Sequence, residues 1–167
     1  MLSVLARHLL SILILPFTVV VALPAILRAT FIESDTNWSA APGLAWLGML
    51  LGILFFLAGL ALFAWCVRLF ASVGRGTLAP WDPTQNMVTS GPYAHVRNPM
   101  ISAVLAMLFG EALFFGSTTL AIWALIFFLI NHFYFIVSEE PGLEKRFGRQ
   151  YLDYKASVPR WIPRIRN

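Results

Sequence analysis

The chain has 167 residues, of which 59% are hydrophobic and 12% are charged. Soluble domains average about 25% charged residues, so this composition excludes an ordinary soluble domain and predicts a single membrane domain over residues 1–167. The formal net charge of +4 does not indicate nucleic-acid binding, because the basic residues flank apolar segments in the manner that orients membrane helices.

Four apolar segments follow one another along the chain: residues 9–27, 43–67, 100–115 and 118–137. A helix needs around 20 residues to cross a hydrocarbon core of about 30 Å, and each segment is close to that length. None of them alternates polar and apolar residues, which favours helices over a barrel. We therefore predict an all-α integral membrane protein with four transmembrane helices. The first segment follows a basic start, as a signal peptide does, but its length and the absence of a clear cleavage site favour a span.

Lysine and arginine residues are distributed unequally between the two sides of these segments. Arg28 alone lies on one side, beside Glu33 and Asp35, and the third and fourth segments are joined by the uncharged Gly116 and Ser117. The other eleven of the twelve basic residues precede the first segment, follow the second or lie in the tail. Basic residues are enriched on the cytoplasmic side of membranes, so both termini and the connection between the second and third segments are predicted to be cytoplasmic.

Small residues in the second apolar segment, residues 43–67, have structural explanations. Gly48 and Gly52 form a GxxxG pattern, and Gly59 lies seven residues further on. Glycines so placed let another helix approach closely, and packing within the bundle is favoured over a homodimer face. Cys66 lies in an apolar run, so it forms no internal disulfide and provides no cysteine-based metal site.

Packing into lipid does not explain residues 85–101, a polar stretch that separates the two pairs of apolar segments. It holds Tyr93, His95 and Arg97, and Gly and Pro residues interrupt it. Asn98 precedes Pro99, and proline suits the first turn of a helix, so the third helix is predicted to begin near Pro99. We interpret His95 as an interfacial loop residue and the stretch as the candidate site.

Three ionisable residues lie within or at the end of the last two apolar segments. Glu111 must face protein or a wet cavity or be protonated, and it is either a structural hydrogen-bonding group or part of a substrate pocket. His132 is either a general base or a buried histidine that a neighbouring helix satisfies. Glu139 lies seven residues after His132, two helical turns, so the two share a face with His132 about 10 Å deeper. With three histidines in the whole chain, no metal site is predicted.

The tail is predicted to form a C-terminal amphipathic helix over residues 143–155. Leu143, Phe147, Tyr151 and Tyr154 recur at helical spacing, and the charged residues lie on the other faces. Such a helix either lies on anionic lipid at the interface or covers the groove beside it as a lid.

Motifs spread over about half of the chain resemble one family. In order they are residues 87–93 (Met-Val-Thr-Ser-Gly-Pro-Tyr), residues 96–99 (Val-Arg-Asn-Pro), the pair Glu139 and Glu140 with Leu143, Phe147, Gly148, Tyr151 and Tyr154, and residues 158–160 (Val-Pro-Arg). Together they resemble the isoprenylcysteine carboxyl methyltransferase and phospholipid methyltransferase superfamily. Its members are multi-pass membrane enzymes that bind S-adenosylmethionine at the cytoplasmic surface and methylate a lipid-borne acceptor.

The resemblance implies a cofactor-binding half, residues 77–163, and a lipophilic or lipid substrate beside the membrane lipids. The residues it assigns to S-adenosylmethionine, with Arg97 facing the cofactor's carboxylate, are Gln85, Asn86, Met87, Val88, Tyr93, Arg97, Asn98, Pro99, Met100, Ile101, Glu139 and Tyr151. Glu139 rather than Glu140 is given the hydrogen-bonding role toward the cofactor. Acceptor chemistry is assigned to His132 and Glu111, the polar groups deeper in the bundle. An anionic acceptor needs no base, whereas an amine needs one unless it binds neutral.

Departures from the family pattern leave the acceptor and the oligomeric state open. Many members have His at the position of Asn98 and Tyr at that of Ile101, and enzymes acting on prenylcysteine carry Arg where this chain has Phe135. A carboxylate, a thiol or an amine therefore stays possible as the acceptor. Two other functions explain part of the sequence: a non-catalytic membrane scaffold or small transporter, and an enzyme like the NADPH-dependent sterol reductases.

Overall fold

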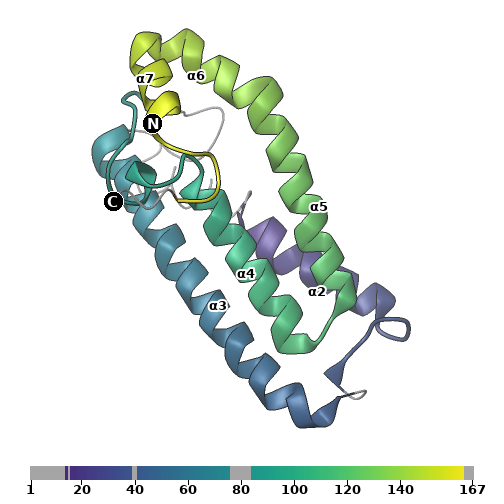
Figure 1. Cartoon of the computed structure of the whole chain (residues 1–167). Coiled ribbons are helices and arrows are strands. Elements are labelled where there is room, and N and C mark those ends of the chain that lie inside the picture. Colours follow the sequence, from purple (N-terminus) through teal and green to yellow (C-terminus); the bar gives the residue numbers. More distant parts are fainter. Residues whose placement is uncertain (1–13, 15, 39–40, 76–83, 164–167) are drawn as a thin grey trace, which may run out of the picture.

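The computed structural model describes residues 14, 16–38, 41–75 and 84–163, and within them it is helical without any strand (Figure 1). The N-terminal elements are the π-helical turn η1 (Thr18–Ala22) and α2 (Leu23–Phe31), followed by the long α3 (Pro42–Leu69) and the π-turn η3 (Phe70–Gly74). The 3-10 turn η4 (Gly91–Ala94) leads into α4 (Pro99–Phe115) and α5 (Thr118–Tyr134). The π-turn η5 (Phe135–Glu139), α6 (Glu140–Phe147) and α7 (Arg149–Ser157) complete the chain.

Within the described residues, two helices are long and apolar enough to cross a membrane. They are the continuous stretches Pro42–Gly74 and Thr118–Phe147, which contain the second and fourth predicted segments. The third segment forms α4, a shorter apolar helix that begins at Pro99 as predicted, and the first is described only from η1 onward. Leu54 and Leu57 on α3 and Ile130 on α5 are more than half exposed, which suits side chains that face lipid.

Two glycines of α3, Gly52 and Gly59, pack closely against α4. A Cβ atom added at Gly52 would lie 2.6 Å from both the Gly110 carbonyl oxygen and the Phe114 amide nitrogen. One added at Gly59 would lie 2.6 Å from the Ala103 carbonyl oxygen. The GxxxG region therefore serves packing inside the molecule, because these glycine faces are covered by the chain's own backbone.

Polar side chains of the loop before α3 fasten it to the turn between α4 and α5. Asp35 accepts hydrogen bonds from the Ser117 hydroxyl and, at 2.9 Å, from the Thr119 amide. Burial raises the pKa of Asp35, but these hydrogen bonds outweigh it and hold the pKa below its usual value. The indole of Trp38 donates to the Leu113 carbonyl at 3.0 Å. This end of the bundle is thereby fixed without any basic residue in the turn.

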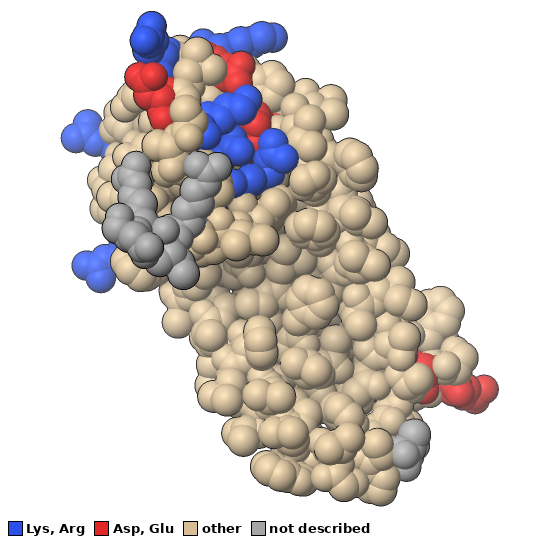
Figure 2. All heavy atoms as spheres, viewed as in Figure 1, with Lys and Arg blue, Asp and Glu red and all other residues tan. Residues whose placement is uncertain are grey.

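Charged residues gather at the two ends of the molecule and leave the middle apolar. Figure 2 shows the lysines and arginines, with several carboxylates, over the end formed by α6 and α7, and a small acidic group at the opposite end. The long intervening surface carries neither sign on the face in view. This distribution is that of a membrane protein with a basic side.

The tail contains two short helices where the sequence predicts one over residues 143–155. Gly148, with φ of 54°, ends α6 and precedes α7. That backbone conformation favours glycine and cannot continue an α-helix, so the chain changes direction there. The turn brings Tyr151 and Tyr154 of α7 back over the start of α4.

Candidate functional site

A small cleft lies where the start of α4, the bend of the last long helix and α7 converge. Its volume is about 30 Å³. The lining residues come from the polar stretch, η5, α6 and α7, and they are Arg97, Asn98, Phe135, Glu139, Glu140, Leu143, Tyr151 and Tyr154. The cleft thus joins the two parts of the sequence in which the motifs lie.

Glu140 holds three basic side chains at the edge of this cleft. Its carboxylate lies 3.0 Å from Arg97 Nη1, 2.7 Å from Arg160 Nε and 3.3 Å from Lys155 Nζ. Glu140 is only 6% exposed. Lys155 also forms an ion pair with Glu144, at 2.6 Å. Three cations thus gather around one buried carboxylate at the edge of the cleft.

Glu139 and Arg97 have unused hydrogen-bonding capacity in the same cleft. Among the described residues no side chain forms an ion pair with Glu139, although Glu139 lines the cleft next to Glu140. Arg97 Nε is buried and has no partner in the described part of the chain, while its Nη1 contacts Glu140 and, weakly at 3.5 Å, the Tyr151 hydroxyl. A buried donor and a free carboxylate side by side suit a ligand that has both an acidic and a basic group.

Hydrogen bonds hold α7 and the tail against the polar stretch. Tyr154 donates to the Tyr93 carbonyl at 2.7 Å, and the Arg97 amide donates to the Pro159 carbonyl at 2.9 Å. Burial raises the pKa of both Tyr93 and Tyr154, so both phenols stay protonated at neutral pH. The tail is therefore held against the polar stretch.

Other residues assigned to the cofactor lie beside the cleft or in the core. Val88 and Tyr93 are buried with Cys66 in a small apolar cluster, against which Met100 packs. The backbone amides of Gln85 and Asn86 donate to the Gly74 carbonyl, which fixes the stretch to the end of α3. Of the predicted set, the structure brings four residues into the cleft: Arg97, Asn98, Glu139 and Tyr151. The remainder, including Met87, Pro99 and Ile101, do not line it.

His132 lies one turn before the cleft and contacts the tail. The Trp161 indole donates to His132 Nδ1 at 3.1 Å, and Phe128 stacks on the imidazole with ring centroids 5.7 Å apart. Because an indole nitrogen can only donate, Nδ1 is the unprotonated nitrogen and its lone pair is in use. With Trp161 in place, His132 has no free basic nitrogen.

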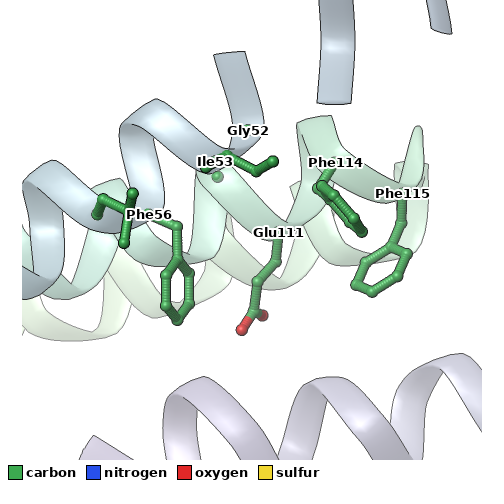
Figure 3. A pocket seen from close by; sticks show the side chains of 8 residues that line it. Gly52, Ile53, Phe56, Glu111, Phe114 and Phe115 are labelled. Atoms are coloured by element: carbon green, nitrogen blue, oxygen red, sulfur yellow. The ribbon is translucent and has the colours of Figure 1, made fainter. Parts of the chain in front are cut away.

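Glu111 lies far from this cleft. It belongs to a second pocket, between α3 and α4 (Figure 3). Glu111 is four residues before the end of α4, whereas the cleft lies at the start of that helix. At the helical rise, His132 and Glu111 are about 15 Å apart along the bundle, measured from the turn that joins their helices. The two residues assigned to acceptor chemistry therefore do not share one site.

Replacing Trp161 with phenylalanine is expected to loosen the tail. Phenylalanine keeps a ring against Phe128 and Phe135 but removes the donor to His132, a hydrogen bond worth about 1 kcal/mol. The Arg97 amide, which donates to Pro159, should then exchange its hydrogen roughly fivefold faster, because 1 kcal/mol corresponds to that factor. Ile162→Ala serves as the control, since Ile162 is 80% exposed. Equal exchange rates in wild type and Trp161→Phe would show that the Trp161–His132 hydrogen bond does not hold the tail in place.

The sequence alone assigned no role in the cleft to Glu140 or to three other residues that line it. Tyr154 and Leu143 stood among the motif residues without a role, and Phe135 was noted only as a departure. The signal was present in the tail: Lys155 and Arg160 lie on the same side of the membrane as Glu140 and need a carboxylate when they are partly buried. Phe135 is 4% exposed in the cleft wall, so this wall is apolar where a prenylcysteine enzyme has a cation.

The fold and the site define a membrane protein whose polar cleft lies at its basic end. A sequence model of the phospholipid methyltransferase family matches residues 47–150, more than half of the chain. The chain belongs to that family and is a methyltransferase-type membrane protein. The match runs from α3 to the first residues of α7, so it contains the cleft residues up to Leu143 but not Tyr151 and Tyr154. Comparison with curated proteins and with solved structures gave no match.

Proposed function

We propose that the chain moves a methyl group from S-adenosylmethionine to a lipophilic or lipid-borne acceptor. The observation that supports this most is the cleft, in which Glu139 and the buried Nε of Arg97 both lack a partner among the described residues. The cofactor's amino-acid end has one group of each charge: Arg97 would bind the carboxylate and Glu139 the ammonium. The family membership makes this chemistry the expected one.

The proposal includes the topology and the cofactor-binding half. In it η1 with α2, α3, α4 and α5 are four spans, both termini are cytoplasmic, and residues 77–163 bind the cofactor; residues 76–83 lie outside the described part of the chain. The cofactor would be approached from the α3 side by the segment Gln85, Asn86, Met87 and Val88. Tyr93, Pro99, Met100 and Ile101 would support the cleft from behind.

The size of the cleft requires the tail to move. A volume of about 30 Å³ is enough for one or two waters and far less than an adenosyl compound needs. The hydrogen bonds of Tyr154 to the Tyr93 carbonyl and of the Arg97 amide to the Pro159 carbonyl hold the tail to the polar stretch, and Arg160 joins it to Glu140 of α6. Displacement of this tail would open the cleft and withdraw Trp161 from His132.

His132 would acquire its basic nitrogen only in that open state. When bound, the cofactor supplies a methyl group on a sulfonium, which is transferred by direct displacement. The chain's part is then to align the acceptor, exclude water and, for an amine, take up one proton. His132 Nδ1 is the candidate for that proton, and an anionic acceptor would not use it.

Calorimetry on the detergent-purified protein tests the proposal directly. S-adenosylmethionine and S-adenosylhomocysteine are expected to bind, and NADPH is not. Arg97→Lys, which keeps the charge but removes the buried Nε, should weaken both adenosyl compounds about tenfold, since a hydrogen bond to a charged group contributes about 1.5 kcal/mol. Lys145→Ala on the exposed side of α6 is the matched control. Folded protein that binds neither adenosyl compound would overturn the proposal in favour of a scaffold, and NADPH binding would favour a reductase.

A further inference from the structure

The pocket around Glu111 has its own wall and its own polar group. It has a volume of about 190 Å³ and lies between Gly52, Ile53, Phe56 and Leu57 of α3 and Gly110, Glu111, Phe114 and Phe115 of α4. Apart from Glu111, none of these side chains has a polar atom. Figure 3 shows the carboxyl group projecting between Phe56 on one side and Phe114 and Phe115 on the other.

One oxygen of this carboxyl group lacks a partner. Glu111 Oε2 is buried and accepts no hydrogen bond from the described residues. Inside a membrane an acidic side chain is costly unless a donor or a counter-charge satisfies it. The orphan oxygen therefore indicates a hydrogen-bond donor that is not part of the described chain.

A positive charge already lies beside the pocket. The Arg28 guanidinium stacks on the Phe115 ring at 3.6 Å from its centroid, and Phe115 is one helical turn from Glu111 on the same face of α4. The charges of Arg28 and Glu111 oppose each other at the pocket, so the attraction of either one for a charged ligand is offset by repulsion from the other. Charge complementarity therefore favours a neutral donor, that is, a hydroxyl group.

We infer that this pocket binds an apolar molecule that has a hydroxyl group, with the hydroxyl donating to Glu111. An apolar cavity of about 150 Å³ is enough to hold benzene, so this pocket accommodates a ring or a short stretch of alkyl chain. A hydroxylated membrane lipid is the occupant with that chemistry. The pocket lies about 18 Å along α4 from Pro99, where the methyltransferase cleft begins, so it is a separate site.

The test compares 4-fluorobenzyl alcohol with 4-fluorotoluene by fluorine NMR, on protein in phosphatidylcholine nanodiscs and at equal probe concentrations in the bilayer. The alcohol is expected to bind about fivefold more tightly, the effect of one hydrogen bond of about 1 kcal/mol. Glu111→Leu should remove that advantage and leave the affinity for 4-fluorotoluene unchanged. Glu111→Gln, which keeps an acceptor oxygen, should retain part of it.

Two controls make every outcome decisive. Leu57→Trp should fill the pocket and abolish binding of both probes, while thermal unfolding of each variant reports whether the fold is kept. Equal affinities for the two probes in wild type would overturn the inference, as would absence of binding, which would mean that water alone satisfies Glu111. A loss of both probes in folded Glu111→Leu would also overturn it, because the carboxylate would then not select the hydroxyl.

Discussion

Gly52→Ala is expected to separate α3 from α4 and to destabilise the protein by about 3 kcal/mol, the upper part of the usual range for overpacking. The added methyl group would lie 2.6 Å from backbone atoms of Gly110 and Phe114, and 2.8 Å from the Phe114 Cα. Backbone atoms of a helix cannot rotate aside as a side chain can, so the two helices must move apart. Contacts of Phe63 and Met107 further along the same interface would weaken with them.

The measurement is unfolding of the detergent-solubilised protein, by denaturant and by heat. Gly43→Ala is the matched control, because Gly43 is in the first turn of the same helix and has no atom within 4 Å of an added Cβ. If Gly52 instead formed a homodimer face, Gly52→Ala would dissociate a dimer and leave the monomer's unfolding unchanged. That result would contradict the packing of α3 on α4.

The helices could be predicted from the sequence because lipid imposes a simple constraint. Uninterrupted apolar runs satisfy their backbone only as helices, and Pro99 marks the start of α4 at the residue where it is observed. The tail was harder, since the periodicity of Leu143, Phe147, Tyr151 and Tyr154 fits a single helix and gives no weight to Gly148. One positive φ at that residue divides the helix and decides where Tyr151 points.

The roles of the two adjacent acids could not be read from α-helical spacing. Residues 135–139 form a π-turn, and a π-turn takes about one residue more than an α-turn. Two turns after His132 therefore end near Glu140, where α-helical spacing predicts Glu139. Such turns have no sequence signature as plain as that of proline or glycine. The contact between Trp161 and His132 also joins residues 29 apart and depends on the tail's path.

The same geometry predicts opposite defects for the two acids. Glu140→Ala should lower the free energy of unfolding by about 3 kcal/mol, because it leaves Arg97 buried without its carboxylate. This is the lower end for breaking a buried ion pair, since Lys155 is a third exposed and partly screened by solvent. Glu139→Ala should leave stability within about 0.5 kcal/mol, since Glu139 pairs with no described side chain. In the proposed function, Glu139→Ala instead weakens S-adenosylhomocysteine about tenfold, more than Glu140→Ala does.

Unfolding and calorimetry on the same preparations separate the two effects. Glu144→Ala is the control, because Glu144 pairs only with Lys155 among the described residues and both side chains are more than a third exposed, which limits its effect to less than about 1 kcal/mol. Lys155 then keeps Glu140 as its partner, so the cluster persists. Equal losses of cofactor affinity in Glu139→Ala and Glu140→Ala would refute the division of roles. A Glu140→Ala protein as stable as wild type would show that the three cations find enough solvent at the membrane surface, and that the tail is held to the cleft by its tyrosines and Trp161 instead.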